Sequence, residues 1–139
     1  MKLLTAAILS VSLAMTSYAF ACPDKDKAQA KSADTGISVD EAAALLKQGK
    51  VIMVDANSNK TRSTEGYVPG ARLLTSFNKF KSSELKAEKS DTLVFYCYNE
   101  SCGAAPAAAK KAGKKGYKTR VMHGGIMGWK QAGHAVAKL

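Results

Sequence analysis

Cysteine, histidine and tryptophan are scarce in this chain of 139 residues, which holds three cysteines, two histidines and one tryptophan. Three cysteines are too few for the disulfide framework that stabilises many small exported domains. The histidines, His123 and His134, have no compact ligand spacing with the cysteines, so we expect neither a metal nor any other cofactor. A hydrogen-bonded structural role is the simplest interpretation of His123, and His134 is expected to be exposed.

Acidic residues are also few, with 11 against 21 basic ones and a formal net charge of +10. The basic residues are scattered along the chain and are not interleaved with aromatic residues, so the sequence does not indicate nucleic-acid binding. We interpret the excess charge as a solvated surface. Attraction of anionic small molecules or anionic membrane surfaces would be its secondary effect.

Long apolar runs are confined to the N-terminus, where Lys2 precedes the apolar residues 3–15 and a small-x-small site ends at Ala21. This pattern predicts a cleaved signal peptide over residues 1–21. The run is too short for a stable membrane span, which takes about 20 apolar residues. We therefore expect export, to the periplasm first of all, with secretion or lipid attachment through Cys22 as less favoured alternatives.

The remaining chain divides into a tether and one domain. Residues 22–36 are polar, charged and without apolar periodicity, which predicts a flexible tether. The folded part is expected over residues 37–139, a length that suits a single domain. Within it, strands alternate with helices, and this alternation predicts a parallel sheet covered by helices on both faces.

Local patterns predict the elements in order. A capping-box pattern from Ser38 and apolar residues at helical spacing predict a helix over 38–48, closed by Gly49. Further along, we expect the following elements: a buried strand at 51–54, a polar turn-like segment at 56–64, a glycine- and proline-containing loop at 66–71, a brief strand edge within 73–80, a helix over 84–88, a strand at 117–122 and a short helix at 126–130.

The most informative stretch is residues 92–103, TLVFYCYNESCG. Its apolar run at 93–96 predicts a strand buried on both faces, and Cys97 stands where that strand ends. An alanine-rich helix over 104–115 follows, with Pro106 tolerable only in its first turn. A short loop between a strand and a helix N-terminus directs several free N–H groups into one small space, so we expect a thiolate at Cys97 to be stabilised.

These residues resemble those of the rhodanese-like (sulfurtransferase) domain. The match runs over the whole of residues 37–139, and its strongest parts are the strand, cysteine, loop and helix at 92–115. Residues 116–121 (GYKTRV) and 124–129 (GGIMGW) are similar to the family's closing motifs, and residues 66–71 (GYVPGA) to an upstream one. The resemblance implies an α/β fold with a parallel five-stranded sheet flanked by helices on both faces.

The resemblance also implies a mechanism in which Cys97 is the catalytic residue. In the family, the cysteine that opens the loop takes sulfane sulfur from a small anionic donor such as thiosulfate, becomes a persulfide and passes the sulfur to a thiol or another thiophilic acceptor, which can be a protein. Carried over to this chain, the substrate-binding loop consists of Tyr98, Asn99, Glu100, Ser101, Cys102 and Gly103. Its six-residue length from Cys97 to Cys102 is the length associated with sulfur transfer.

Several positions depart from the family pattern. Cys102 stands where the loop often ends in arginine, Asn57 replaces an upstream arginine, and Tyr67 replaces a common histidine. Glu100 adds a negative charge inside the loop, which disfavours thiosulfate, so a persulfide or polysulfide is an alternative donor. Arg62 and Arg72 are candidates to replace the missing loop arginine, although nothing in the sequence places them near Cys97.

Cys102 leaves two roles open, because a cysteine five residues after Cys97 is either a small packing residue or a resolving thiol that closes a disulfide with Cys97. The sequence therefore supports three hypotheses: a sulfurtransferase using Cys97, a thiol-disulfide redox module using both cysteines, and a non-catalytic domain that binds a partner through the same pocket. For Asp55 and Trp129 we expect structural roles, the latter in the core.

Overall fold

The computed structural model describes residues 36–139. The predicted signal peptide, Cys22 and all but the last residue of the predicted tether lie outside the described residues. That last residue, Gly36, belongs to a strand, because β1 (Gly36–Ile37) pairs in parallel with β5 (Lys118–Met122). A two-residue strand has too little alternation to be recognised in a sequence, so the pattern places the start of the fold one residue late.

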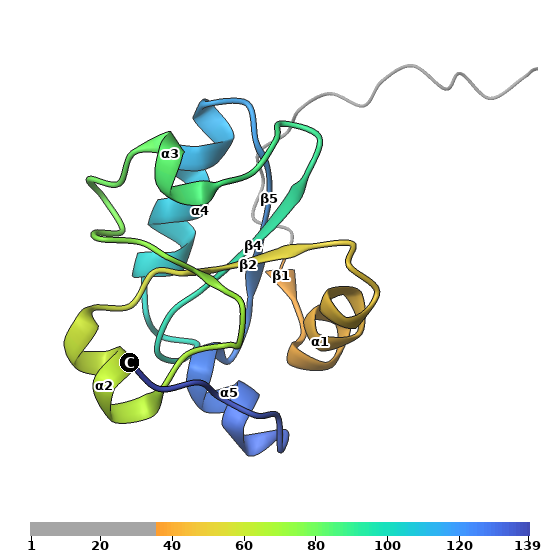
Figure 1. Cartoon of the computed structure of the whole chain (residues 1–139), viewed down its shortest axis with the longest axis vertical. Helices are drawn as coiled ribbons and strands as arrows, with labels where there is room; N and C mark the ends of the chain where they lie inside the picture. The colour runs from red at the N-terminus through yellow and green to blue at the C-terminus, as the bar shows by residue number, and fades with distance from the viewer. Residues whose placement is uncertain (1–35) are drawn as a thin grey trace, which may run out of the picture. The chain divides into compact units, whose positions relative to one another are not determined.

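Five parallel strands form one sheet in the order β1-β5-β4-β2-β3 (Figure 1). The other strands are β2 (Ile52–Asp55), β3 (Arg72–Leu73) and β4 (Thr92–Tyr96). The central β4 is buried from its second residue to its last, as its unbroken apolar run predicts. The parallel five-stranded sheet is therefore confirmed.

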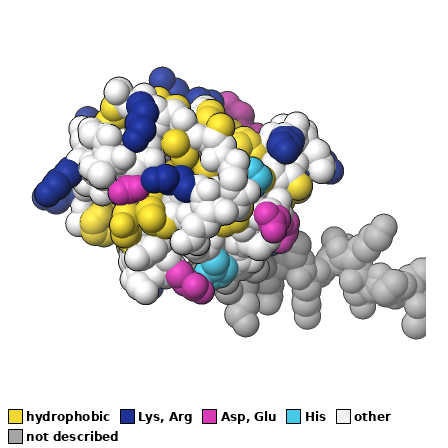
Figure 2. Space-filling model, turned by 90° about the horizontal axis from the view of Figure 1, so that it is seen from below, with side chains coloured by type: hydrophobic (Ala, Val, Ile, Leu, Met, Phe, Trp, Pro, Cys, Tyr) yellow, Lys and Arg dark blue, Asp and Glu magenta, His cyan; other side chains and the backbone are white. Residues whose placement is uncertain are grey.

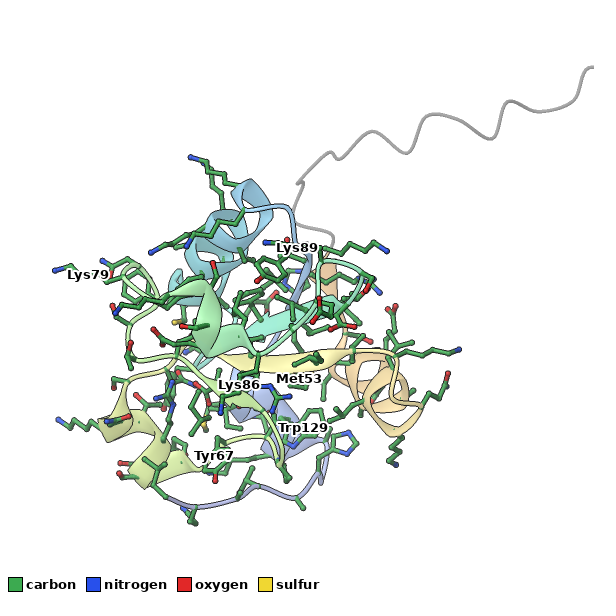
Figure 3. The ribbon with its side chains drawn as sticks, turned by 45° about the horizontal axis from the view of Figure 1, so that its top comes forward. Met53, Tyr67, Lys79, Lys86, Lys89 and Trp129 are labelled. Carbon is green, nitrogen blue, oxygen red and sulfur yellow. The ribbon has the colours of Figure 1, made fainter. Side chains whose placement is uncertain are left out.

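Helices cover both faces of this sheet. On one face, α3 (Ser82–Leu85) and α4 (Ala104–Lys114) pack on a core cluster that contains Phe80 and Phe95. On the other face, α1 (Val39–Lys47) and α5 (Gly125–Gln131) enclose a second cluster. Met53 of β2 and Trp129 of α5 both belong to this second cluster, and Figure 3 shows them on the same side of the sheet. The predicted core position of Trp129 is confirmed.

Two helical predictions need correction. Residues 56–64, predicted to be turn-like, contain α2 (Asn59–Glu65), which begins where the Ser58 side chain accepts a hydrogen bond from the Thr61 N–H. The pattern missed α2 because its one buried side chain is that of an arginine, Arg62. The helix expected over 84–88 is α3, which ends earlier because Lys86 adopts a left-handed backbone with φ of 45°.

None of the helices within residues 36–139 has both the length and the apolar character needed to cross a membrane.

Candidate active site

Cys97 lies at the carboxyl edge of the sheet, between the end of β4 and the start of α4. The neighbouring strands β2 and β5 end at the same edge, at Asp55 and just before His123. In open parallel sheets, ligands bind outside this edge, where the loops after the strands meet. Figure 2 views the molecule from below, where basic, acidic and histidine side chains are scattered among uncharged and apolar ones.

A cavity of about 120 Å³ opens beside Cys97. One buried water needs only about 15 Å³, so the cavity has room for a small group bound to the sulfur. Its lining comes from the loop, from α4 and from the end of β5: Cys97, Asn99, Glu100, Cys102, Ala105, Pro106, Val121, Met122 and His123. No lysine or arginine is among these lining residues, so the cavity itself offers no cation to an anionic donor.

The start of α5 holds the loop in place from one side. The backbone N–H of Ile126 donates to the Cys97 carbonyl at 2.8 Å, and the N–H of Met127 donates to the Tyr98 carbonyl at 3.1 Å. Gly125 makes this approach possible, since a Cβ atom there would lie 2.6 Å from the Cys97 carbonyl oxygen. The glycine pair in the 124–129 motif therefore serves to bring helix α5 against the loop that starts at Cys97.

The Cys97 thiol is almost fully buried, with 2% of the residue exposed. Its Sγ donates a hydrogen bond to the Cys102 carbonyl oxygen at 3.1 Å. Burial, followed by the hydrogen bond between the two thiols, raises the pKa of Cys97 to about 12, although the backbone N–H groups of Ala105 and Tyr98 act in the opposite direction. The expectation of a stabilised thiolate at Cys97 is thus reversed in this resting conformation, because desolvation outweighs the N–H groups.

Cys102 is the more acidic of the two free thiols. Partial burial disfavours its ionised form, but the hydrogen bond from the Cys97 thiol and the N–H groups of Tyr98 and Ala104 outweigh that effect and lower the pKa of Cys102. The side chain is half-buried and lines the same cavity as Cys97. The structure therefore brings together two thiols of opposite character, one buried and neutral, the other more open and more easily ionised.

The other residues of the predicted substrate-binding loop take separate positions. Asn99 and Glu100 line the cavity and are exposed, whereas Tyr98 and Ser101 are exposed without lining it. Gly103 is the N-cap residue of α4. The loop closes on itself through a hydrogen bond of 3.2 Å from the Cys102 N–H to the Asn99 carbonyl, so it is a compact turn above the helix start.

Asp55 has the structural role expected from the sequence. Its carboxylate is fully buried and accepts hydrogen bonds from the Tyr96 hydroxyl at 2.7 Å and from the Asn57 N–H at 2.6 Å. The Arg62 Nε lies 3.3 Å from the same carboxylate. The Tyr96 hydroxyl in turn accepts from the Val68 N–H at 2.9 Å. No pattern in the sequence indicates Tyr96 as a polar partner, since its position in an apolar run predicts only a buried strand residue.

The arginines considered as replacements for a loop arginine do not reach the Cys97 cavity. Arg62 is 2% exposed, and its guanidinium donates to the carbonyls of Asp55 and Leu74 at 3.0 and 2.8 Å. Arg72 lines a different cavity. Tyr67 is also absent from the cavity lining, because it pairs with the C-terminal segment at Ala137. Figure 3 shows Tyr67 on the side of the C-terminal segment.

His123 lines the cavity, although the sequence indicated only a structural role for it. Its imidazole packs against Gly36, where an added Cβ would lie 1.7 Å from Nε2. Its place directly after β5, like that of Cys97 directly after β4, is the signal that could have identified it. His134 packs instead against the ring of Trp129, with centroids 4.5 Å apart. Within residues 36–139, no cluster of three potential metal ligands occurs.

The comparisons with known proteins agree with this fold. The family model described as Rhodanese-like domain matches residues 38–132, and the chain therefore belongs to the rhodanese-like family. No curated protein matches the sequence.

Solved structures share the fold at low sequence identity. A protein from Bacillus halodurans is 24% identical with a TM-score of 0.66, and the match covers 74% of this chain and 76% of that one. A rhodanese-like domain protein from Staphylococcus aureus is 20% identical with a TM-score of 0.57, covering 68% of this chain and 89% of that one. A thiosulfate sulfurtransferase from Pseudomonas aeruginosa is 16% identical with a TM-score of 0.62, covering 76% of this chain but only 20% of that one.

Proposed function

We propose that this protein is an exported sulfurtransferase that carries sulfane sulfur as a persulfide on Cys97. The observation that supports it most is the placement of the Cys97 sulfur at the wall of a cavity of about 120 Å³, with the N–H groups of Tyr98 and Ala105 directed to it. These N–H groups can hydrogen-bond a persulfide anion, and the cavity has room for its outer sulfur. Membership of the rhodanese-like family adds to this support.

The transfer consists of two displacements at the outer sulfur. A protein thiolate attacks the sulfane sulfur of the donor, and the donor's sulfur–sulfur bond breaks to release sulfite from thiosulfate or a thiol from an organic persulfide. An acceptor thiolate then attacks the outer sulfur of the Cys97 persulfide, and the Cys97 thiol is restored. Because no lysine or arginine lines the cavity, we propose a persulfide or polysulfide as the better donor and thiosulfate as a weaker one.

One experiment on cells that express the full chain tests both parts of the proposal. The protein is purified from separate cell fractions, incubated with sodium polysulfide or thiosulfate, and weighed intact. Export predicts a polypeptide that begins at Cys22 in the periplasmic fraction. Sulfur transfer predicts a gain of one sulfur atom that maps to Cys97 and disappears when a thiol acceptor is added. Full-length protein confined to the cytoplasm would contradict export, and unchanged mass with both donors would contradict sulfur transfer.

A thiol-disulfide redox module is the second candidate, and the presence of both Cys97 and Cys102 at the wall of one small cavity favours it. It predicts the loss of two hydrogens and a bond between these cysteines in the same measurement. A non-catalytic binding domain predicts neither species, and it also predicts that Cys97→Ser leaves partner binding unchanged.

A further inference from the structure

The proposed function leaves one chemical difficulty, which concerns the first displacement. Only the thiolate attacks sulfur, and the reference pKa of a cysteine thiol is about 8.5. Cys97 is almost fully buried and its thiol proton is engaged with the Cys102 carbonyl at 3.1 Å. The residue best placed to hold the persulfide is therefore poorly suited to attack the donor.

Cys102 has the complementary properties. It is more exposed than Cys97 and lines the same cavity. The Cys97 S–H donates to the Cys102 carbonyl oxygen at 3.1 Å and Cys97 is 2% exposed, so the sulfur of the half-buried Cys102 is the more accessible of the two. A donor that enters the cavity therefore meets the Cys102 sulfur before that of Cys97.

We propose that Cys102 takes the sulfur from the donor and passes it inward to Cys97, an inference that rests on the proposed sulfurtransferase function. In the first step, the Cys102 thiolate attacks the outer sulfur of the donor, and the donor leaves as sulfite or a thiolate. In the second step, Cys97 attacks the outer sulfur of the Cys102 persulfide, and the bond between that sulfur and Cys102 breaks. The departing Cys102 sulfur takes up the Cys97 proton, so no net oxidation occurs. Cys102 is thus a second catalytic residue, in addition to Cys97.

The relay gives each thiol the environment that its step needs. The open thiolate of Cys102 suits attack on a solvent-borne donor, and the buried site of Cys97 shields the stored persulfide from water and stray thiols. The N–H groups of Ala105 and Tyr98 surround the stored sulfur, whereas those of Tyr98 and Ala104 face Cys102. Transfer between the two thiols needs no large movement, because the Cys97 thiol already contacts Cys102 through its carbonyl oxygen and both residues line one small cavity.

Two variants, each with one of the two cysteines replaced, test whether Cys102 is loaded before Cys97. The rate of sulfur gain from sodium polysulfide is followed by intact mass and peptide mapping. With Cys97→Ser, whose hydroxyl still donates a hydrogen bond, Cys102 is expected to gain one sulfur at a rate close to that of the wild type. With Cys102→Ser, loading of Cys97 at pH 7 is expected to fall at least about tenfold, because the remaining thiol is almost fully buried and burial raises its pKa to about 12. Raising the pH towards the pKa of Cys97 is expected to restore that rate. Circular dichroism spectra identical to that of the wild type exclude misfolding as the cause.

The pH profile needs a control, because Glu100 and His123, two ionisable side chains, also line the cavity. The same series in Glu100→Gln and His123→Gln separates their ionisation from that of the thiols. Equal loading rates in Cys102→Ser and the wild type, or no sulfur on Cys102 in Cys97→Ser, would overturn the relay while leaving the sulfurtransferase intact. A Cys97–Cys102 disulfide formed on loading would also overturn the relay in favour of a resolving role. No sulfur gain in the wild type would instead refute the proposed function itself.

Discussion

At the scale of single residues, the polar groups behind the candidate site stabilise the fold, and the thiols in front of them are the groups on which the proposed function depends. Asp55 and Arg62 are both fully or nearly fully buried, so their charges depend on each other and on their hydrogen bonds. A buried ion pair contributes little by itself, but removing one partner leaves the other charge unpaired in a poorly solvated site. Arg62, on α2, thus stabilises the fold and does not line the Cys97 cavity.

We predict that Arg62→Met lowers the free energy of unfolding by about 3–5 kcal/mol, because it leaves the Asp55 carboxylate without its cation and two backbone carbonyls without their donor. Urea denaturation measures the effect. Arg120→Met is the matched control, since Arg120 forms an exposed ion pair with Glu41 at 2.8 Å, and such pairs contribute about 0–1 kcal/mol. Equal losses in the two variants would show that burial does not distinguish the pairs.

At the scale of elements, the contact between the start of α5 and the Cys97 loop places the site. Gly125 has a positive φ of 58° and lies against the backbone of Cys97 and Tyr98, so two separate demands exclude a side chain. The helix start then donates two hydrogen bonds to the carbonyls at the beginning of the loop. An apparently distant motif at 124–129 therefore determines the conformation of the catalytic loop.

Gly125→Ala is expected to destabilise the fold by about 1–3 kcal/mol more than Gly49→Ala, because only Gly125 adds a steric clash to the strain of a left-handed backbone. Gly49 is a suitable control, since its φ of 66° is similar and its Cβ position faces open space. Thermal unfolding of both variants gives the comparison, and sulfur loading should fall only in Gly125→Ala. A Gly125→Ala protein that matches Gly49→Ala in both measurements would refute this account of the loop.

At the scale of the whole molecule, the excess of positive charge and the lack of cations in the cavity have different consequences. A net charge of +10 raises the local concentration of anions around the protein over tens of ångströms at low salt. Lys79 illustrates the placement of such charge, pointing outward from the surface in Figure 3. The cavity lining contains the acidic Glu100 and no lysine or arginine, so the attraction of anions acts at long range, outside the cavity, and not within it.

Loading by the divalent anion thiosulfate is therefore expected to slow about two- to fivefold as ionic strength rises from about 0.01 to 0.15 M, over which the Debye length falls from about 30 to 8 Å. Stopped reactions weighed at intervals give the rates. Alkylation by neutral iodoacetamide is the control, and its rate should be nearly independent of salt. A thiosulfate rate that does not change with salt would mean that the basic surface has no part in donor capture.

Local patterns were sufficient for the parts of this protein whose signals lie within a few residues. Sterics and burial alone specify three such parts: the apolar run at 93–96, the alanine-rich helix with Pro106 in its first turn and the glycine pair at 124–125. Together these patterns identified the family and the position of Cys97. By contrast, α2 was missed because Arg62, the side chain that anchors it, is polar and finds its partners on β2 and beyond β3.

The sequence by itself determined the alternation of strands and helices, the thiol at the end of the central strand and the loop length, because these depend on side-chain periodicity and backbone sterics. Only the tertiary structure decided which thiol is the more acidic and which charged residues reach the cavity. Both depend on burial and on contacts between segments far apart in the chain, as where Tyr96 meets Asp55 and α5 meets Cys97. Desolvation is a property of the assembled fold, and no local pattern encodes it.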